Sequence, residues 1–140
     1  RGRTPLPARP GDRIQVTSRS LSSLAQQPNV LGGGPLLMQN GHVVLNGRQE
    51  GFSPGFMSLA APRTVVAQGP SGQWLMTLRG AAGSDPTLVE TALAAQQMGL
   101  RDALNMDGGS STTLVVAGRT VMNGRSSTPR VHNGLGLIPL

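Results

Sequence analysis

The sequence predicts an α+β fold, in which a mostly antiparallel or mixed β-sheet built from hairpins packs against one main helix. Two observations lead to this prediction. The chain of 140 residues contains 20 Gly and 11 Pro, which favours tight turns and short elements over long helices. Several short apolar runs flank turn signals, whereas the segment at about 86–98 places its apolar residues with helical spacing. A chain of this length forms one domain or part of one.

The sequence of the N-terminal part predicts an extended arm followed by one strand. Residues 1–12 are rich in Pro, Gly and Arg and are expected to form an extended basic arm. The run RIQVTS at 13–18 alternates apolar and polar residues, as a half-buried strand does. Residues 20–29 predict a loop or a short helical turn that ends before Pro28.

Two hairpins are predicted next. Residues 30–47 form two apolar runs around Gln-Asn-Gly, and Asn-Gly is the strongest local hairpin signal because both residues accept positive φ. Residues 48–61 are expected to be irregular. The runs TVVAQ at 64–68 and QWLMTL at 73–78 predict a second hairpin, and residues 80–84 predict a loop.

The helix signals follow. Asp85 is suited to cap the helix, Pro86 to occupy its first position and Gly99 to end it. The predicted apolar stripe consists of Leu88, Val89, Ala92 and Leu93.

The remaining elements are predicted strands. DALNM at 102–106 predicts a buried strand, and residues 113–124 predict a third hairpin that turns at Gly118-Arg119. Residues 132–140 predict a short closing strand.

Composition excludes several classes of protein. The net charge is +6, but all 12 basic residues are Arg and are spread singly, and aromatic residues make up 2% of the chain, which disfavours nucleic-acid binding. No Cys is present for a disulfide or thiolate site, and no apolar run is long enough for a membrane span. Neither His42 nor His132 lies near a carboxylate pair in the sequence, so no metal or cofactor is predicted. Because the sequence starts at Arg1 without Met, a processed product or a fragment is expected.

The stretch NMDGGSST is the main candidate site. Asp107 follows a strand that should be buried, so its carboxylate is expected at the rim of the sheet, where ligands bind. Gly108 and Gly109 allow backbone N–H groups to approach a ligand closely. The hydroxyls of Ser111 and Thr112 add donors that suit an anion or a sugar. A plain Asp-Gly-Gly turn with Ser/Thr caps is the alternative interpretation.

Other polar residues are further candidates. Arg63 directly precedes a predicted strand, which fixes its direction and makes it a candidate anion ligand, and Arg79 ends the next strand. The stretch PRVHNG carries three more polar side chains that could converge on one site, those of Arg130, His132 and Asn133. The alternative interpretation is that Arg63 and Arg79 are ordinary surface arginines and that His132 is an ordinary loop residue.

Together these fragments resemble the phosphodiester glycosidase family, the uncovering-enzyme-like domains. The resembling pieces, in matching order and spacing over residues 31–138, are LGGGPLLMQNG, EGFS, APRT, PTLVETALAAQQMGL, DALNMDGGSSTTL and RVHNGLGL. The RVHNG variant is most similar to cyanobacterial members, which are bacterial proteins. The resemblance is to the C-terminal part of the family's domain. Residues 13–140 are therefore expected to form that part, with the upstream half on a missing stretch or another protein chain.

The resemblance implies a hydrolase that cleaves a sugar from a glycosyl-1-phosphodiester, in an extracytoplasmic (periplasmic or secreted) location. A phosphorylated leaving group departs as a stable anion, so it needs charge neutralisation by arginine, for which Arg63 and Arg130 are candidates. A carboxylate is needed near the anomeric carbon, which indicates Asp107, and Glu50 is the second carboxylate at a family position. The implied substrate-binding residues are Arg63, Gly108, Gly109, Ser111, Thr112, Arg130, His132 and Asn133.

A non-catalytic role is the alternative. The resemblance implies a polar cluster at the end of the strand at 73–78, but the sequence there reads TLRGAAGSD, with Leu78 where a polar group is expected. The alternative function is therefore an interaction or structural subunit of a larger assembly, which keeps the fold around an eroded site.

Overall fold

The computed structural model describes four stretches of the chain, residues 7–17, 23–81, 84–124 and 130–138. The chain divides into two compact units, residues 1–31 and 32–140. The predicted sheet and main helix both lie in the second unit, which therefore carries the candidate site.

The first unit contains one short helical element. The 3-10 helix η1 (Ser23–Gln26) confirms the helical turn predicted before Pro28. In the predicted arm, the Arg9 N–H donates to the Asp12 carboxylate at 2.7 Å and the Asp12 N–H donates to the Arg9 carbonyl at 3.0 Å, which closes a turn. Residues 1–6 of the arm lie outside the described residues.

The strand predicted at 13–18 is wrong over residues 13–17, which form no strand, and residue 18 lies outside the described residues. The side chains of Ile14 and Val16 are 58% and 88% exposed. Alternation buries apolar side chains only when a sheet receives the strand, and no strand within the described stretches pairs with this segment.

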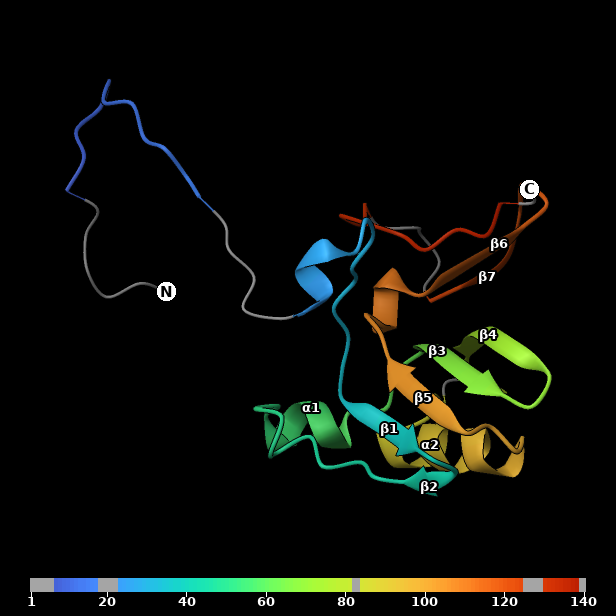
Figure 1. Ribbon diagram of the computed structural model, residues 1–140. Helices are drawn as coiled ribbons and strands as arrows, with labels where there is room; N and C mark the ends of the chain where they lie inside the picture. Colours follow the sequence, from blue (N-terminus) through green and yellow to red (C-terminus); the bar gives the residue numbers. More distant parts are fainter. Residues whose placement is uncertain (1–6, 18–22, 82–83, 125–129, 139–140) are drawn as a thin grey trace. The chain divides into compact units, whose positions relative to one another are not determined.

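Five strands of the second unit form one antiparallel sheet, which confirms the predicted fold class (Figure 1). The order is β2-β1-β5-β3-β4, and every neighbouring pair is antiparallel. The strands are β1 (Leu36–Gln39), β2 (His42–Val43), β3 (Arg63–Gly69), β4 (Gly72–Leu78) and β5 (Asp102–Asn105). β5 therefore lies at the centre of the sheet although it comes after the other four strands in the sequence.

Both hairpins predicted within this sheet are confirmed. β1 and β2 are joined through Asn40 and Gly41, whose φ values of 50° and 82° are those that an Asn-Gly turn provides. β3 and β4 pair continuously from Arg63 opposite Leu78 to Gly69 opposite Gly72, so this hairpin extends beyond its predicted strands.

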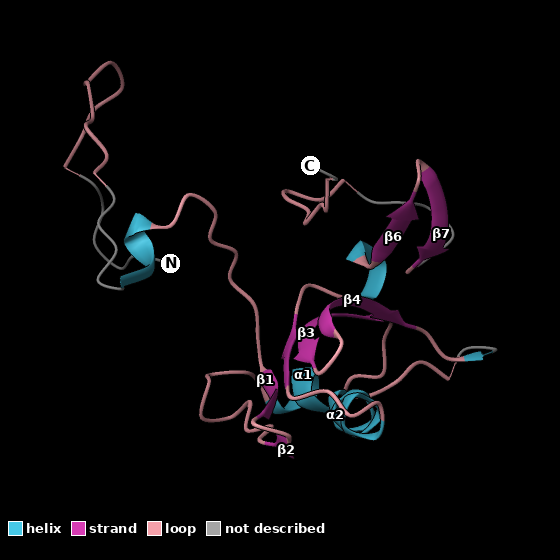
Figure 2. Ribbon diagram, turned by 45° about the vertical axis from the view of Figure 1, so that its right-hand side comes forward, coloured by secondary structure: helices cyan, strands magenta, loops and turns pink. Residues whose placement is uncertain are grey.

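A separate two-stranded sheet, β6 (Thr113–Val116) and β7 (Arg119–Asn123), confirms the third predicted hairpin (Figure 2). Its turn lies at Ala117-Gly118, with φ values of 50° and 75°, and not at the predicted Gly118-Arg119. The prediction is wrong by one residue because Arg119 pairs with the last residue of β6 and so already belongs to β7.

The closing strand predicted at 132–140 is wrong over residues 132–138, and residues 139–140 lie outside the described residues. Its apolar residues are exposed, since no strand of the described stretches pairs with this segment.

The main helix, α2 (Leu88–Gln97), begins at a different cap from the predicted one. Thr87, not Asp85, is the N-cap, so Pro86 precedes the helix. The Thr87 hydroxyl accepts the Glu90 N–H at 3.3 Å, and the Glu90 carboxylate accepts the Thr87 N–H at 2.7 Å. This capping box satisfies two helix donors at once, which a lone Asp cap does not.

The predicted end of α2 is confirmed, because Gly99 has a φ of 71° directly after the C-cap. The predicted stripe is wrong in part, since Val89 and Leu93 are 53% and 46% exposed. One sheet face covers only one side of the helix, which is the i, i+3, i+4, i+7 side. The buried residues are Leu88, Thr91, Ala92 and Ala95.

The core lies between α2 and one face of the five-stranded sheet (Figure 2). Residues 48–61, predicted to be irregular, contain the short helix α1 (Pro54–Ser58), and its Phe56 and Met57 pack against this core. The core residues are Leu37, Met38, Val65, Ala67, Leu88, Ala92, Ala95, Leu100 and Ala103.

Replacing Thr87 with Ala is expected to lower the free energy of unfolding by about 1 kcal/mol, because the Glu90 N–H loses its acceptor. The Thr87 N–H and hydroxyl hold the pKa of the Glu90 carboxyl below its ordinary value. Glu90 therefore stabilises the fold above its unfolded pKa, and this contribution is lost as pH falls through the lowered pKa. Urea unfolding at neutral and acidic pH measures both effects. Thr120→Ala, on exposed β7, is the matched control, and an equal loss in the two variants would contradict the prediction.

Candidate functional site

The antiparallel topology gathers several predicted site segments at one edge of the sheet. Because β5 runs antiparallel to both β1 and β3, its end lies beside their starts. β4 is antiparallel to β3, so its end lies at the same edge. We call this edge the strand-end rim, formed by residues 33–36, 62–64, 78–80 and 105–109. Fragments that are far apart in the sequence thus form one local structure.

Asp107 lies at the strand-end rim, two residues past the end of β5, and is exposed. The Met106 N–H donates to the Thr64 carbonyl at 2.8 Å, which extends the pairing of β5 with β3 by one residue. One carboxylate oxygen of Asp107, Oδ1, accepts the Gly108 N–H at 2.9 Å. The pairing of β5 with β3 therefore places Asp107 at the rim of the sheet, as the sequence predicts.

Gly108 and Gly109 pass close beneath the start of β3. The Gly109 N–H donates to the Pro62 carbonyl at 2.7 Å, and a Cβ on Gly108 would lie 2.9 Å from the same oxygen. The N–H groups of both glycines are thus used within the protein, by Asp107 and Pro62. The structure shows a close backbone approach, and the prediction that these glycines contact a ligand stays a prediction.

The hydroxyl cluster forms the short 3-10 helix η3 (Gly109–Ser111) and the turn into β6. Ser111 is half-buried, whereas Thr112 is fully buried. The Thr64 hydroxyl donates to the Thr112 hydroxyl at 3.2 Å, and the Gly124 N–H donates to the Thr112 carbonyl at 2.6 Å. Thr112 therefore ties this turn to both β3 and the end of β7.

Arg63, the first residue of β3, is buried, with 2% of its surface exposed. Its Nε donates to the Pro86 carbonyl at 3.2 Å, and a terminal nitrogen donates to the Leu59 carbonyl. Burial lowers the pKa of this guanidinium, and the negative charge of Asp85 opposes that shift. An arginine stays charged under these conditions, so Arg63 places a fixed positive charge beneath the strand-end rim.

Glu50 reaches the same rim from the loop before α1. Its two carboxylate oxygens accept the Leu36 N–H at 3.0 and 3.2 Å, which holds the start of β1. Its carboxylate lies next to Gly34, since a Cβ there would be 3.5 Å from Oε2. The structure thus brings Glu50 to the rim that carries Asp107, although nothing in the local sequence predicts its bond to β1.

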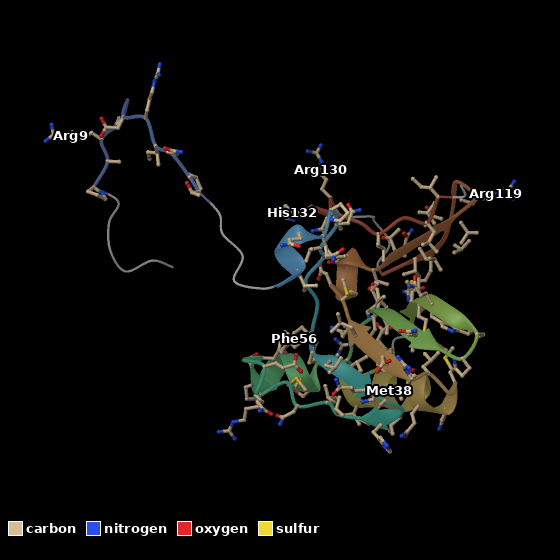
Figure 3. The ribbon with its side chains drawn as sticks, in the orientation of Figure 1. Arg9, Met38, Phe56, Arg119, Arg130 and His132 are labelled. Carbon is tan, nitrogen blue, oxygen red and sulfur yellow. The ribbon has the colours of Figure 1, made fainter. Side chains whose placement is uncertain are left out.

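Arg130, His132 and Asn133 lie in the C-terminal segment and are exposed. Figure 3 shows Arg130 and His132 away from Met38 of the core. Among the described residues, no hydrogen bond joins these three side chains to the strand-end rim. The remaining arginine candidate, Arg79, donates to the Asn123 carbonyl at 3.0 Å and so connects β4 to β7.

Sequence reasoning missed Asn105, the last residue of β5, which is 1% exposed. Its Nδ2 donates to the Gly34 carbonyl at 2.8 Å, while its Oδ1 is buried with no hydrogen-bond partner among the described residues. The run DALNM at 102–106 does carry a signal for this role. A side-chain amide in an otherwise apolar strand must form its hydrogen bonds inside the fold, so Asn105 is expected to join two segments.

An open hollow of about 600 Å³ lies beside α1 and the start of α2. Its lining is largely apolar and includes Leu45, Phe52, Met57 and Val89, but none of the predicted site residues. In the described stretches, no three His, Asp or Glu side chains gather into a group that could hold a metal ion. No helix of the described residues has the length and apolar character needed to cross a bilayer.

Comparison with known proteins gives the following relationships. The family model for phosphodiester glycosidases matches residues 1–138. The structure of a hypothetical protein from Synechocystis is similar, with 38% identity and a TM-score of 0.63 over 69% of this chain. The zebrafish N-acetylglucosamine-1-phosphodiester alpha-N-acetylglucosaminidase catalytic domain, auto-inhibited by its pro-peptide, is 20% identical with a TM-score of 0.54 over 66% of this chain, a likeness of fold alone. The chain spans 18% of the Synechocystis protein and 34% of the zebrafish domain. No curated protein matches it.

Proposed function

The chain belongs to the phosphodiester glycosidase family, and from this premise we propose that it forms part of a hydrolase that cleaves a sugar from a glycosyl-1-phosphodiester. The observation that carries the proposal is the position of Asp107. Its exposed carboxylate lies just past the central strand, at the rim where the fragments before β1, at the start of β3 and after β5 meet. The proposal concerns a larger active protein, because the chain spans a minor share of its structural relatives.

In the proposed reaction, the bond between the anomeric carbon and the phosphate oxygen breaks. Water supplies the new oxygen on the sugar, and the phosphorylated group leaves as a stable anion. Such a leaving group needs little protonation, so the reaction depends on stabilising charge at the anomeric carbon and at the phosphate. A carboxylate and arginines are the residues that this chemistry requires.

Asp107 is the proposed carboxylate at the anomeric carbon, where it stabilises positive charge or accepts a proton from water. Glu50 is the proposed second carboxylate, because its bond to the Leu36 N–H keeps it at the same rim. The residues between Asp107 and β6 are the proposed contacts to the sugar or the phosphate. They are Gly108, Gly109, Ser111 and Thr112.

Two arginines are assigned different proposed tasks. Arg63 is buried with its guanidinium on two carbonyls, so we assign it a fixed charge beneath the rim instead of a direct contact. Arg130 is exposed and is the proposed direct phosphate ligand. His132 and Asn133 are proposed to bind the substrate beside it, once the C-terminal segment meets the rim.

The proposed partner is the upstream half of the same domain, on this protein or on another chain, and the proposed location is periplasmic or secreted. The non-catalytic alternative is favoured by Leu78 at the expected polar position and by one structural observation. Among the predicted ligand groups, Arg63 and the N–H groups of both glycines already bind within the protein.

Hydrolysis of a panel of chromogenic sugar-1-phosphodiesters in ¹⁸O-water tests the proposed function. The chain is assayed alone and together with the upstream half of the domain. We expect hydrolysis with both halves present, and ¹⁸O in the released sugar, because the sugar carbon is the atom attacked. Label in the phosphate would indicate a phosphodiesterase instead. No turnover by the folded, complete protein would favour the non-catalytic subunit.

A further inference from the structure

Asn105 makes three hydrogen bonds to the turn that precedes β1. Its carbonyl accepts the Gly34 N–H at 2.6 Å, and its own N–H donates to the Pro35 carbonyl at 3.2 Å. Its side-chain Nδ2 donates to the Gly34 carbonyl at 2.8 Å. The end of the central strand and this turn are therefore joined by both backbone and side chain.

The two segments are packed too closely to shift independently. A Cβ on Gly33 would lie 2.8 Å from the Asn105 carbonyl and 2.6 Å from the Met106 sulfur. A Cβ on Gly34 would lie 2.9 Å from the Phe52 ring, and Gly34 has a φ of 156° that L residues rarely adopt. The glycines thus allow the turn before β1 to lie directly against the end of β5, and the bond from the Asn105 amide holds the turn in that position.

The same turn also binds Glu50, through the Leu36 N–H at 3.0 Å. Two residues after Asn105 comes Asp107. A short path therefore connects the two proposed carboxylates, from Glu50 through the residues 34–36 to Asn105 and on to Asp107.

We propose that Asn105 is a positioning residue that sets the placement of Asp107 relative to Glu50. This inference rests on the proposed function, because it assigns those two carboxylates to one reaction. The separation of two carboxylates decides whether water or a carboxylate attacks a glycosidic carbon, so a residue that fixes the separation affects turnover more than binding.

An amide is required at this position for a chemical reason. Gly34 presents a carbonyl, so its partner must donate, and Nδ2 does so without carrying charge. A carboxylate of the same shape cannot donate to a carbonyl, whereas a protonated carboxyl group can. Asn105→Asp therefore removes the bond at neutral pH and restores it when the introduced group is protonated, and burial favours that protonation.

The test measures the amide NMR signals and hydrogen exchange of Asn105→Asp and the wild type between pH 4 and 8, with kcat and KM on any active substrate. The charged groups at the strand-end rim are Asp107, Glu50 and Arg63, and Asp85 interacts with Arg63, so the wild type is measured over the same range. In Asn105→Asp at neutral pH, we expect the Gly34 N–H to exchange about tenfold faster than in the wild type and the Gly108 amide signal to shift. Both changes should disappear in acid, where the introduced carboxyl group is protonated. We expect kcat to fall about 100-fold with little change in KM.

Thr91→Val is the matched control, since Thr91 is a buried polar residue of α2 whose hydroxyl donates to the carbonyl of the N-cap, Thr87. It should leave the Gly34 and Gly108 signals and kcat unchanged. If Asn105→Asp does not fold at neutral pH, Asn105→Ser, which carries no charge and is too short to reach Gly34, replaces it. Unchanged exchange at Gly34 and unchanged Gly108 signals in a folded variant would overturn the proposal. If the folded, complete wild-type protein hydrolyses no substrate, the proposed function fails, while the NMR result still decides whether Asn105 positions Asp107.

Discussion

Replacing Asp107 with Asn is expected to lower kcat/KM for a glycosyl phosphodiester by about 10²- to 10⁴-fold, the range for loss of a residue that transfers a proton or stabilises charge. The amide keeps the shape of the side chain but not its negative charge. Because the Asp107 side chain is exposed and, among the described residues, is bonded only to its neighbour Gly108, stability should change little. Kinetics with the complete protein, together with a thermal melt of the variant, measure the two quantities separately.

Asp102→Asn is the matched control, since Asp102 begins the strand after whose end Asp107 lies. Its carboxylate accepts the Asn40 N–H at 2.9 Å and an Arg101 N–H at 2.8 Å, at the opposite end of β5. This variant should keep its activity. Equal activity of Asp107→Asn and the wild type would remove Asp107 from the mechanism.

Replacing Arg63 with Met is expected to lower the free energy of unfolding by about 3 kcal/mol, because two carbonyls lose a charged donor inside the fold. The Leu59 and Pro86 carbonyls belong to the segments just before β3 and α2, so Arg63 joins these two segments. Arg63→Lys should lose less, since it keeps a donor but not the planar fork. Guanidinium chloride unfolding of the three proteins measures the difference.

Arg79→Met is the control for Arg63→Met, because Arg79 is exposed and, within the described stretches, its side chain makes one hydrogen bond, to the Asn123 carbonyl. It should change stability by about 0.5 kcal/mol or less. A stable Arg63→Met variant with a raised KM would instead identify Arg63 as a direct phosphate ligand, as the sequence predicts.

The sequence was sufficient for features that depend on local chemistry. The Asn40-Gly41 turn and the Gly99 helix end follow from positive φ, which few residues accept. The start of α2 was misplaced because Asp85 and Thr87 are both residue types that cap helices, and the reciprocal Thr87–Glu90 bonds distinguish them. Short-range signals therefore identify elements better than their boundaries.

The site was predictable in part. Asp107 is expected at a sheet rim because it follows an apolar run, and the structure places it there. The role of Arg63 depends on the Leu59 and Pro86 carbonyls, and the Pro86 carbonyl is contributed by a segment more than 20 residues away. The role of Asn105 depends on Gly34, 71 residues earlier in the chain. Such partners follow from topology, which a single sequence does not specify.

The central position of β5 also has a consequence for how the protein folds. β1, β2, β3 and β4 can pair locally as two hairpins, but β5 must insert between them, and its pairing with β1 closes a loop of about 60 residues. The strand-end rim does not exist before that insertion, since its contacts at Gly34 and Pro62 both require β5 or the loop after it. We therefore expect the site to form in the last step of folding, so that a chain still emerging from the ribosome has both hairpins and no site.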